Sequence, residues 1–210
     1  MQRKRWIALL ALALLLVSFV GCAGDQVEED EIFPAARALI EESKVLNELY
    51  FGEGIPVRGD VALEGVYAQA DRGALQEMGF EGIADIREKT KQVFSPSMCS
   101  WLFGRAFSAE STGTGVSLAR YYEKSDQNNT LMVLTTAEVY LNGAVTYDYS
   151  TMKIKGQHRD TVELTLEATV TTEAGLSRKE TITVKVIKES DGWRLDSPTY
   201  LVYASYPEIG

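Results

Sequence analysis

The sequence is poor in the side chains that most often bind metals or carry nucleophilic catalysis. Its 210 residues include one histidine, His158, and two cysteines, Cys22 and Cys99. A zinc site needs a cluster of ligands, and a catalytic thiol needs an adjacent base. The chain also lacks a glycine-rich loop followed by the lysine that a phosphate-binding loop requires. The sequence therefore indicates no metal site, no cofactor and no catalytic residue.

Positive charge is also scarce. The chain has 21 Lys and Arg against 30 Asp and Glu, a formal net charge of −9. Arg3, Lys4 and Arg5 lie in the first 21 residues, which contain no acidic side chain, so the chain from residue 22 onward carries −12. Binding to nucleic acid or to anionic lipid needs a basic surface, so we expect neither.

A membrane-spanning hydrophobic run is missing as well. The apolar run over residues 6–20 is shorter than the roughly 20 residues of a spanning helix. It follows a basic start and ends in Phe19-Val20-Gly21-Cys22. This pattern resembles the lipobox of bacterial lipoproteins, in which the cysteine after the glycine is lipidated. The alternatives are an ordinary secretory signal and an uncleaved anchor.

The lipobox resemblance implies a signal peptide over residues 1–21 and lipid attachment at Cys22. Acyl chains such as palmitate would then hold an extracytoplasmic protein at the cell membrane, because each buried methylene contributes about 0.8 kcal/mol. Cys99, in an apolar helical context, would be left without a disulfide partner and is predicted to be a small buried side chain. A reactive thiol and a Cys22–Cys99 disulfide are the alternatives.

The lipidated cysteine and an acidic tether are predicted over residues 22–33, and a single domain over 34–210. Pro34 suits the first position of a helix, where its missing N–H is not needed, and Gly52 suits its end. Residues at three- and four-residue spacing make an apolar stripe along this helix. They are Ala36, Leu39, Ser43, Leu46 and Tyr50.

Two more helices are predicted before residue 108. The first carries a stripe of Ile83, Ile86, Thr90 and Val93. The second has Ser95 as its N-cap and Pro96 as its first residue, and it runs to Phe107. Residues 108–115 are predicted to form a loop.

Everything after this loop has the pattern of β-strands. Between Thr161 and Thr172 apolar and polar side chains alternate without a break, which predicts one buried and one solvated face. Strands are predicted over residues 116–123, 131–141, 144–154, 161–172, 178–188 and from 193 onward. Asn142-Gly143 predicts a hairpin, and a shift in the alternation near Ser150 predicts a β-bulge.

Helices followed by long antiparallel strands predict an α+β fold, with N-terminal helices packed on a curved antiparallel sheet. The layout, with its closing Asp191-Gly192-Trp193-Arg194-Leu195-Asp196, resembles the nuclear transport factor 2-like or cystatin-like cone. A first helix ending in Tyr50-Phe51-Gly52, a strand at Tyr67 and Phe94-Ser95-Pro96 are similar in order to secreted inhibitors of cell-wall DL-endopeptidases. This resemblance implies a non-catalytic protein that binds a peptidoglycan hydrolase, and no functional residue is carried over from it.

Two local motifs resemble catalytic sequences but lack the geometry that the chemistry requires. Ser150-Thr151-Met152-Lys153 matches the Ser-x-x-Lys of β-lactamases, but that motif needs a helix and here lies in a strand. Tyr147-Asp148-Tyr149 offers an acid beside two tyrosines, but alternation places Asp148 on the opposite face from both rings. His158 lies in a polar stretch and is expected at the surface.

The sequence therefore favours a non-catalytic binding or inhibitory module with an envelope or cell-wall partner. The alternative is a small-molecule carrier or enzyme with an aromatic pocket at the mouth of the cone. Its candidate walls are Trp101, Tyr147, Tyr149 and Trp193. A spacer subunit of an envelope complex is a third hypothesis, and the oligomeric state stays open.

Overall fold

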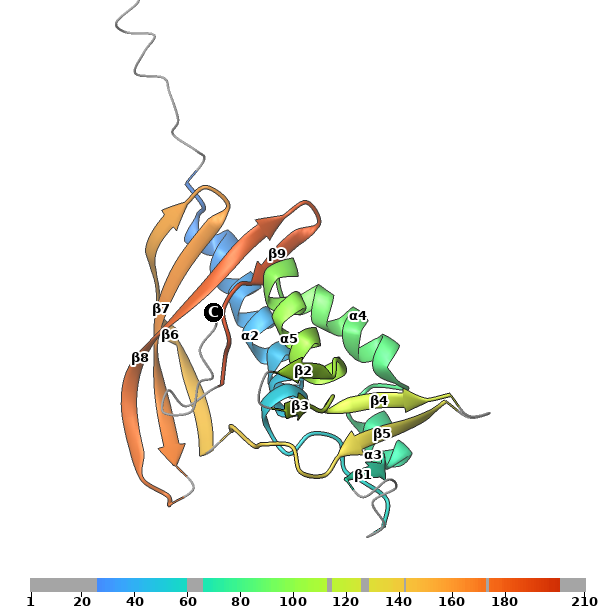
Figure 1. The fold of residues 1–210 in the computed structure, drawn as a ribbon. Helices are drawn as coiled ribbons and strands as arrows, with labels where there is room; N and C mark the ends of the chain where they lie inside the picture. Colours follow the sequence, from blue (N-terminus) through green and yellow to red (C-terminus); the bar gives the residue numbers. More distant parts are fainter. Residues whose placement is uncertain are drawn as a thin grey trace, which may run out of the picture.

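The computed structural model describes residues 26–59, 66–112, 115–125, 129–141, 143–172 and 174–200. The helices of this part are α2 (Glu29–Phe51), α3 (Arg72–Glu77), α4 (Ile83–Val93) and α5 (Pro96–Phe107). The strands are β1 (Tyr67–Gln69), β2 (Glu110–Thr112), β3 (Gly115–Ser117), β4 (Tyr121–Lys124), β5 (Thr130–Leu134), β6 (Gly143–His158), β7 (Thr161–Thr172), β8 (Ser177–Glu189) and β9 (Gly192–Leu195). All strand pairs inside the sheets are antiparallel, and the fold is α+β (Figure 1).

The largest sheet is an antiparallel meander in the order β6-β7-β8-β9. β7 and β8 pair in unbroken register from Thr161 opposite Ile187 to Thr171 opposite Ser177. The alternation predicted for β7 is confirmed, because its apolar face is buried and its polar face is half-buried or exposed. The buried side chains are Val162, Leu164, Leu166, Ala168 and Val170.

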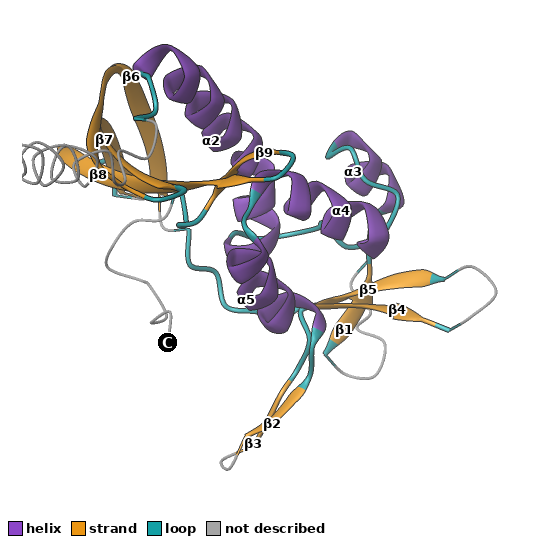
Figure 2. Ribbon diagram, turned by 90° about the horizontal axis from the view of Figure 1, so that it is seen from above, coloured by secondary structure: helices purple, strands orange, loops and turns teal. Residues whose placement is uncertain are grey.

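Helix α2 covers the buried face of this sheet, with α5 and α4 beside it (Figures 1 and 2). The apolar stripe predicted for α2 is confirmed, since all five of its residues are buried. Four of them, all except Ser43, join one hydrophobic core with β7 and β8. Full burial of an apolar side chain such as Leu164 or Leu46 stabilises the fold by about 1.5–3 kcal/mol. This packing is the main force that holds the helices on the sheet.

The predicted β-bulge in β6 is confirmed. The register with β7 shifts between Asp148 and Lys153. The Asp148 carboxylate accepts hydrogen bonds from the N–H and the hydroxyl of Ser150, at 3.1 and 2.6 Å. Thr151 then bridges the strands, because its hydroxyl accepts from the N–H of Glu167 at 2.8 Å. These side chains pair the main-chain groups that the bulge removes from the ladder.

The other strands do not extend this sheet, which corrects the expectation of a single curved sheet. β1, β5 and β4 form a separate three-stranded sheet, and β2 pairs with β3. The predicted strand over 131–141 ends at Leu134, and its predicted hairpin partner β6 pairs with β7 instead. The chain leaves β5 because the N–H groups of Tyr140 and Leu141 bond to Phe51 O at the end of α2. Asn142 lies outside the described residues.

The stretch between α5 and β4 also differs from the prediction. The expected loop over 108–115 contains β2, and the expected strand over 116–123 is divided into β3 and β4. The hairpin of β2 and β3 projects away from the helices (Figure 2). Local pairing between two short segments decides this arrangement, and periodicity over three residues is too short to reveal it.

Helix α2 begins at Glu29 and not at Pro34, so part of the predicted tether is helical. Ile32 is fully buried, and the Glu31 carboxylate accepts from Trp193 Nε1 at 3.0 Å and pairs with Lys188. These contacts with β8 and β9 outweigh the hydrogen bond that Pro34 cannot donate. The other predicted helices are confirmed as α4 and α5, and Ser95 Oγ accepts from Met98 N at 3.2 Å as the predicted N-cap of α5.

The last turn of α2 contains no basic residue of its own, and Arg120 supplies the positive charge from elsewhere in the chain. Its guanidinium donates to Tyr50 O at 3.5 Å and to Gly52 O. The hydroxyl of Tyr121 donates to Leu49 O at 2.7 Å. The terminal carbonyls of a helix have no partner within the helix and carry its negative dipole end, so a buried cation is favourable here.

Candidate functional site

The main candidate site is a groove between α2 and the start of β6, with a volume of about 740 Å³. Its apolar wall includes Val45 of α2 and Val145 of β6. β6 is an edge strand, so one side of its main chain faces away from the sheet. We call this site the α2–β6 groove. An edge strand beside an apolar groove can accept an extended peptide by strand addition.

Carboxylates of α2 line the groove. Glu42 pairs with Lys89 of α4 at 2.5 Å, and Glu41 pairs with Arg37 at 3.0 Å. Glu48 Oε1 accepts from the N–H of Glu53 at 2.9 Å. Glu41 and Glu42 are exposed and Glu48 is half-buried, because α2 turns this polar face away from its buried stripe. The groove therefore combines apolar contacts with a charged rim, in which these three glutamates stand beside two lysines, Lys44 and Lys89.

A tyrosine cluster closes one end of the groove. Tyr200 lines the groove, its ring meets Tyr147 edge-on at 5.0 Å, and its N–H donates to Tyr147 Oη at 2.9 Å. The ring centre of Tyr149 lies 6.1 Å from that of Tyr147. The guanidinium carbon of Arg37 lies 4.9 Å from the ring centre of Tyr149. Burial and the neighbouring Tyr200 raise the pKa of Tyr149 well above its usual range. The cluster is therefore neutral at physiological pH and offers hydroxyl groups and ring edges.

The four candidate wall residues do not share one pocket. Tyr147 and Tyr149 lie together in the tyrosine cluster. Trp193 is 8% exposed and packs between Lys188 and Glu31, with Lys188 Nζ 4.7 Å from its ring. Trp101 lies at a separate place on α5, with its ring 5.5 Å from that of Phe51. The structure thus brings together the two tyrosines and separates the two tryptophans from them.

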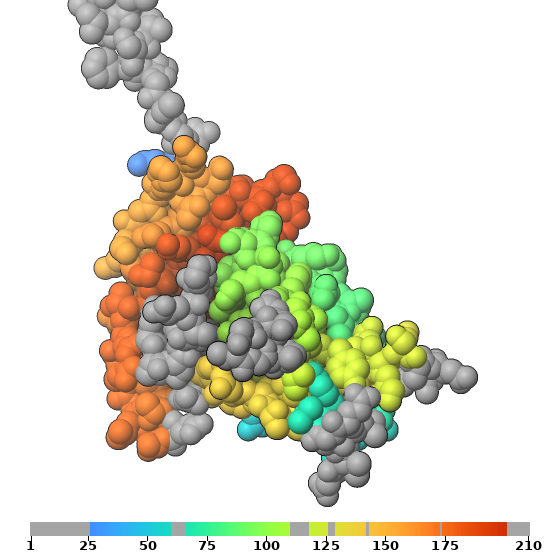
Figure 3. Space-filling view, in the orientation of Figure 1, coloured from blue at the N-terminus to red at the C-terminus, as the bar shows by residue number. Residues whose placement is uncertain are grey.

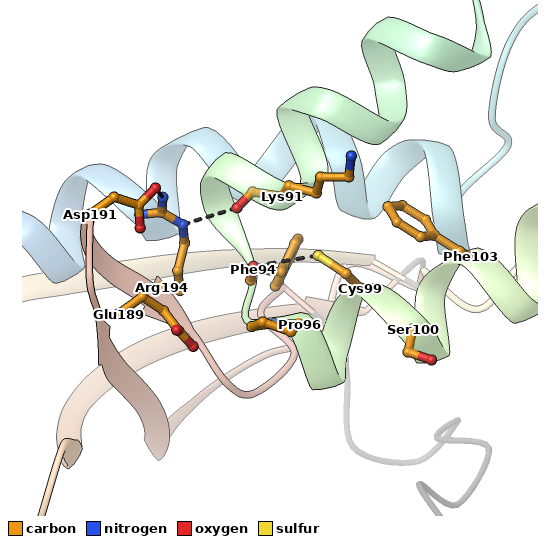
Figure 4. Close-up of a pocket in the computed structure, with 9 residues that line it drawn as sticks. All are labelled: Lys91, Phe94, Pro96, Cys99, Ser100, Phe103, Glu189, Asp191 and Arg194. Carbon is orange, nitrogen blue, oxygen red and sulfur yellow. Dashed lines mark hydrogen bonds and ion pairs between the residues drawn. The ribbon is translucent and has the colours of Figure 1, made fainter.

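A second pocket of about 540 Å³ lies between the α4–α5 junction and the β8–β9 turn (Figure 4). In Figure 3 the red β8–β9 segment lies against the green helices that form the other wall. Arg194 crosses this pocket and donates to Lys91 O at 2.9 Å and to Asp191 Oδ2 at 2.7 Å. The bond to Lys91 O joins β9 to α4, and the bond to Asp191 holds the guanidinium in place, so Arg194 is already engaged in holding the two walls together.

Cys99 lies at the base of this second pocket, and its thiol is 3.4 Å from Phe94 O. The residue is 5% exposed, and burial raises the pKa of the thiol to about 11. A buried thiol with a raised pKa is a poor nucleophile. Cys99 is present as a free thiol, which confirms its prediction as a small buried side chain. Cys22 lies outside the described residues.

The other motif residues are placed as the alternation predicts. Asp148 is exposed and bonds to Ser150, whereas Tyr147 is buried on the opposite face. Ser150 and Lys153 lie at the bulge of β6, outside any helix. His158 is exposed at the end of the same strand.

The groove carboxylates were not singled out by the sequence analysis. They lie on α2 opposite the apolar stripe, where charged residues usually mean only a solvated surface. Only the contact of this face with β6 distinguishes Glu41 and Glu48 from other surface glutamates. That contact has no local pattern in the sequence, so no sequence signal could have found them. The same holds for Arg120, which reaches α2 from about 70 residues away.

Within the described ranges, no group of three or more His, Cys, Asp and Glu side chains could hold a metal ion. No helix of the described part is both long and apolar enough to cross a membrane. No protein-family model matches the chain, and no curated protein or solved structure matches it significantly.

Proposed function

We propose that this chain is a membrane-anchored extracytoplasmic lipoprotein whose α+β domain acts as a non-catalytic binding or inhibitory module. The N-terminal pattern ending in Cys22 supports the anchor, because a basic start, a short apolar run and Gly-Cys occur in the required order. A long meander packed on α2 supports the finer assignment to the nuclear transport factor 2-like or cystatin-like cone. The partner we propose is a cell-wall hydrolase of the same envelope.

The observation that carries the proposal is the α2–β6 groove. Residues 143–146 of an edge strand line it, its walls include Val45 and Val145, and its rim carries three glutamates and two lysines. The occupant that fits is an extended segment of the partner protein with apolar and basic side chains. Main-chain hydrogen bonds would provide affinity, and the excess of glutamates over lysines at the rim would favour the basic side chains. The mature charge of −12 also favours association with a basic partner.

The tyrosine cluster favours this reading over a carrier or an enzyme. The ring of Tyr200, which lines the groove, packs against that of Tyr147 and takes up space beside it. The space that remains is an open groove, and small ligands are usually held in pockets that enclose most of their surface. An extended segment, in contrast, needs an open groove that it can enter from the side.

The binding test compares two substitutions in the full-length chain purified in detergent. Val45→Lys places a charge in the wall of the groove, and Leu176→Lys places one at the β7–β8 turn, where Leu176 is 72% exposed. We expect the wild-type chain to bind and inhibit a purified DL-endopeptidase from the same envelope. Val45→Lys should abolish the inhibition, and Leu176→Lys should leave it unchanged. An absence of binding by the wild-type chain would reject the hydrolase as partner, and equal effects of the two variants would reject the groove.

The anchor is tested separately by Cys22→Ala. We expect the variant to leave the membrane fraction and appear in the soluble extracytoplasmic fraction, because the acyl chains supply the membrane affinity. If the variant stays membrane-bound, the lipoprotein assignment is wrong. A mutant that is released but still inhibits the hydrolase would show that anchoring and binding are independent.

A further inference from the structure

A smaller pocket, of about 320 Å³, lies away from the α2–β6 groove and is lined by two arginines. Arg105 comes from the last turn of α5, and Arg120 precedes β4. Leu118 adds an apolar wall, and the segment from Leu134 to Tyr140 closes the remaining side. We call this the arginine pocket. Its volume is at the lower end of the range of small-molecule sites, so it suits a ligand of few atoms.

Arg120 is a buried cation without a buried anion. It is 7% exposed, and its bonds to the end of α2 are accompanied by one to Glu138 O at 3.2 Å and one to Tyr121 Oη at 3.1 Å. The partners of Arg120 are thus main-chain carbonyls and a phenol, and no carboxylate of the described ranges pairs with it. A guanidinium has five N–H groups, and these four bonds use four of them while the positive charge stays without a carboxylate partner.

Arg105 is held in place by two aromatic rings. Its guanidinium carbon lies 5.6 Å from the centre of the Trp101 ring and 5.1 Å from that of Tyr140. The guanidinium also makes a side-chain hydrogen bond with Tyr140, which uses one of its five N–H groups. No carboxylate in the described part of the chain lies within 4.0 Å of this guanidinium. Arg105 is therefore preorganised, charged and unneutralised at the pocket.

Glu138 is the one acidic side chain among the described residues that line the pocket. It accepts a hydrogen bond from the Tyr140 hydroxyl. Burial and this bond to Glu138 raise the pKa of Tyr140, so its hydroxyl keeps its proton. The lining therefore carries two positive charges against one negative charge, in a chain whose net charge is −9.

From this arrangement we infer that the arginine pocket binds a small organic carboxylate. The planar guanidinium fork of Arg105 matches the two oxygens of a carboxylate, and the positive charge of Arg120 in the same lining adds to the attraction. The apolar side chain of Leu118 accommodates a short alkyl group beside the carboxylate. The inference is independent of the proposed partner at the α2–β6 groove, because the two sites share no lining residue.

The test is isothermal titration calorimetry on the full-length chain in detergent, at constant ionic strength set with chloride. The probe is N-acetylalanine, which has one carboxylate and one methyl group, and its neutral control is N-acetylalanine amide. We expect saturable binding of the acid and none of the amide. Inorganic phosphate is titrated in parallel, and tighter binding of phosphate would overturn the assignment to carboxylates.

Substitutions locate the site. Arg105→Gln should weaken binding at least about tenfold, because it removes a charge-assisted pair. The affinity of Arg105→Lys should lie between those of the wild type and Arg105→Gln, because lysine keeps the charge and lacks the planar fork. The matched control is Arg87→Gln, since Arg87 also lies over aromatic rings of α5, 4.7 Å from Phe107, but outside the pocket. Glu138→Gln should tighten binding, because it removes the one like charge.

Three further results would overturn the inference. The first is an absence of saturable binding of N-acetylalanine by the wild-type chain. The second is a loss in Arg87→Gln as large as that in Arg105→Gln, which would indicate a general charge effect. The third is unchanged affinity in Glu138→Gln together with unchanged affinity in Arg105→Gln, because the pocket would then play no part.

Discussion

Arg120→Met tests whether a distant arginine completes the end of α2. The substitution keeps most of the apolar stem and removes the guanidinium, which donates to Tyr50 O and Gly52 O of the helix end and to Glu138 O. Methionine can make none of these bonds. The carbonyls of residues 50 and 52 would lose the donor that neutralises the negative end of the helix dipole.

The size of the effect follows from the bonds. Those to Gly52 O and Glu138 O come from a charged donor and are worth about 1.5–3 kcal/mol each, whereas the 3.5 Å contact with Tyr50 O adds little. Removing a buried charge also recovers part of its desolvation cost, which offsets the loss. We therefore expect the free energy of unfolding to fall by about 3 kcal/mol. In a chain of this size that lowers Tm by about 6–12 °C.

Urea unfolding followed by circular dichroism measures this loss. Arg120→Lys should recover about 1 kcal/mol of it, because an ammonium still interacts with the helix dipole. Arg72→Met is the control, since the Arg72 side chain is 71% exposed, and its effect should stay within about 0.5 kcal/mol. A loss below about 1 kcal/mol in Arg120→Met, or one equal to the control, would refute the assigned role.

Three further predictions use other parts of the fold. Gly54→Ala should cost at least about 2 kcal/mol, because Gly54 has φ +80° and a Cβ there would lie 2.2 Å from Tyr121 Oη. Gly79→Ala, at φ +90° with nothing within 4 Å, should cost only about 1 kcal/mol in the same urea assay, and equal losses would contradict the clash. Hydrogen bonds from Lys188 and Trp193 lower the pKa of Glu31 from 4.5, so its carboxylate stabilises the fold above that pH and the contribution disappears as the pH falls through the lowered value. Glu31→Gln should accordingly be less stable than the wild type at pH 7, with the gap closing below pH 4.5; a gap that persists in acid would argue against the ion pair. In a variant without the other cysteine, Cys99 should react with a disulfide reagent at pH 8 more than about a hundredfold more slowly when folded than in urea, and similar rates would show that the thiol is accessible.

The sequence predicted the elements whose signals lie close together along the chain. The alternation of β7 assigned its buried face correctly, because strand side chains alternate whatever lies around them. Ser95-Pro96 located the start of α5, because an N-cap acts on amides within three residues. The bulge near Ser150 was visible as a shift of that same alternation.

The candidate site was predicted only in part. Tyr147 and Tyr149 lie together, as their spacing on one strand requires, and they form the end of the α2–β6 groove with Tyr200. Trp101 and Trp193 were grouped with them by residue type alone, and the structure places each elsewhere. Residue type shows which side chains prefer a half-buried wall, but it carries no information on which wall.

By itself, then, the sequence determined the class of the fold, the buried faces of its strands and helices, and the acidic charge of the chain. These properties depend on composition and on neighbours a few residues apart. The tertiary structure decided how the strands divide into separate sheets, where α2 begins, and which arginine completes its end. Glu31 and Trp193, or Gly52 and Arg120, meet only after the chain has folded back on itself. Contacts over such separations have no periodic signature, and the groove and the arginine pocket both consist of them.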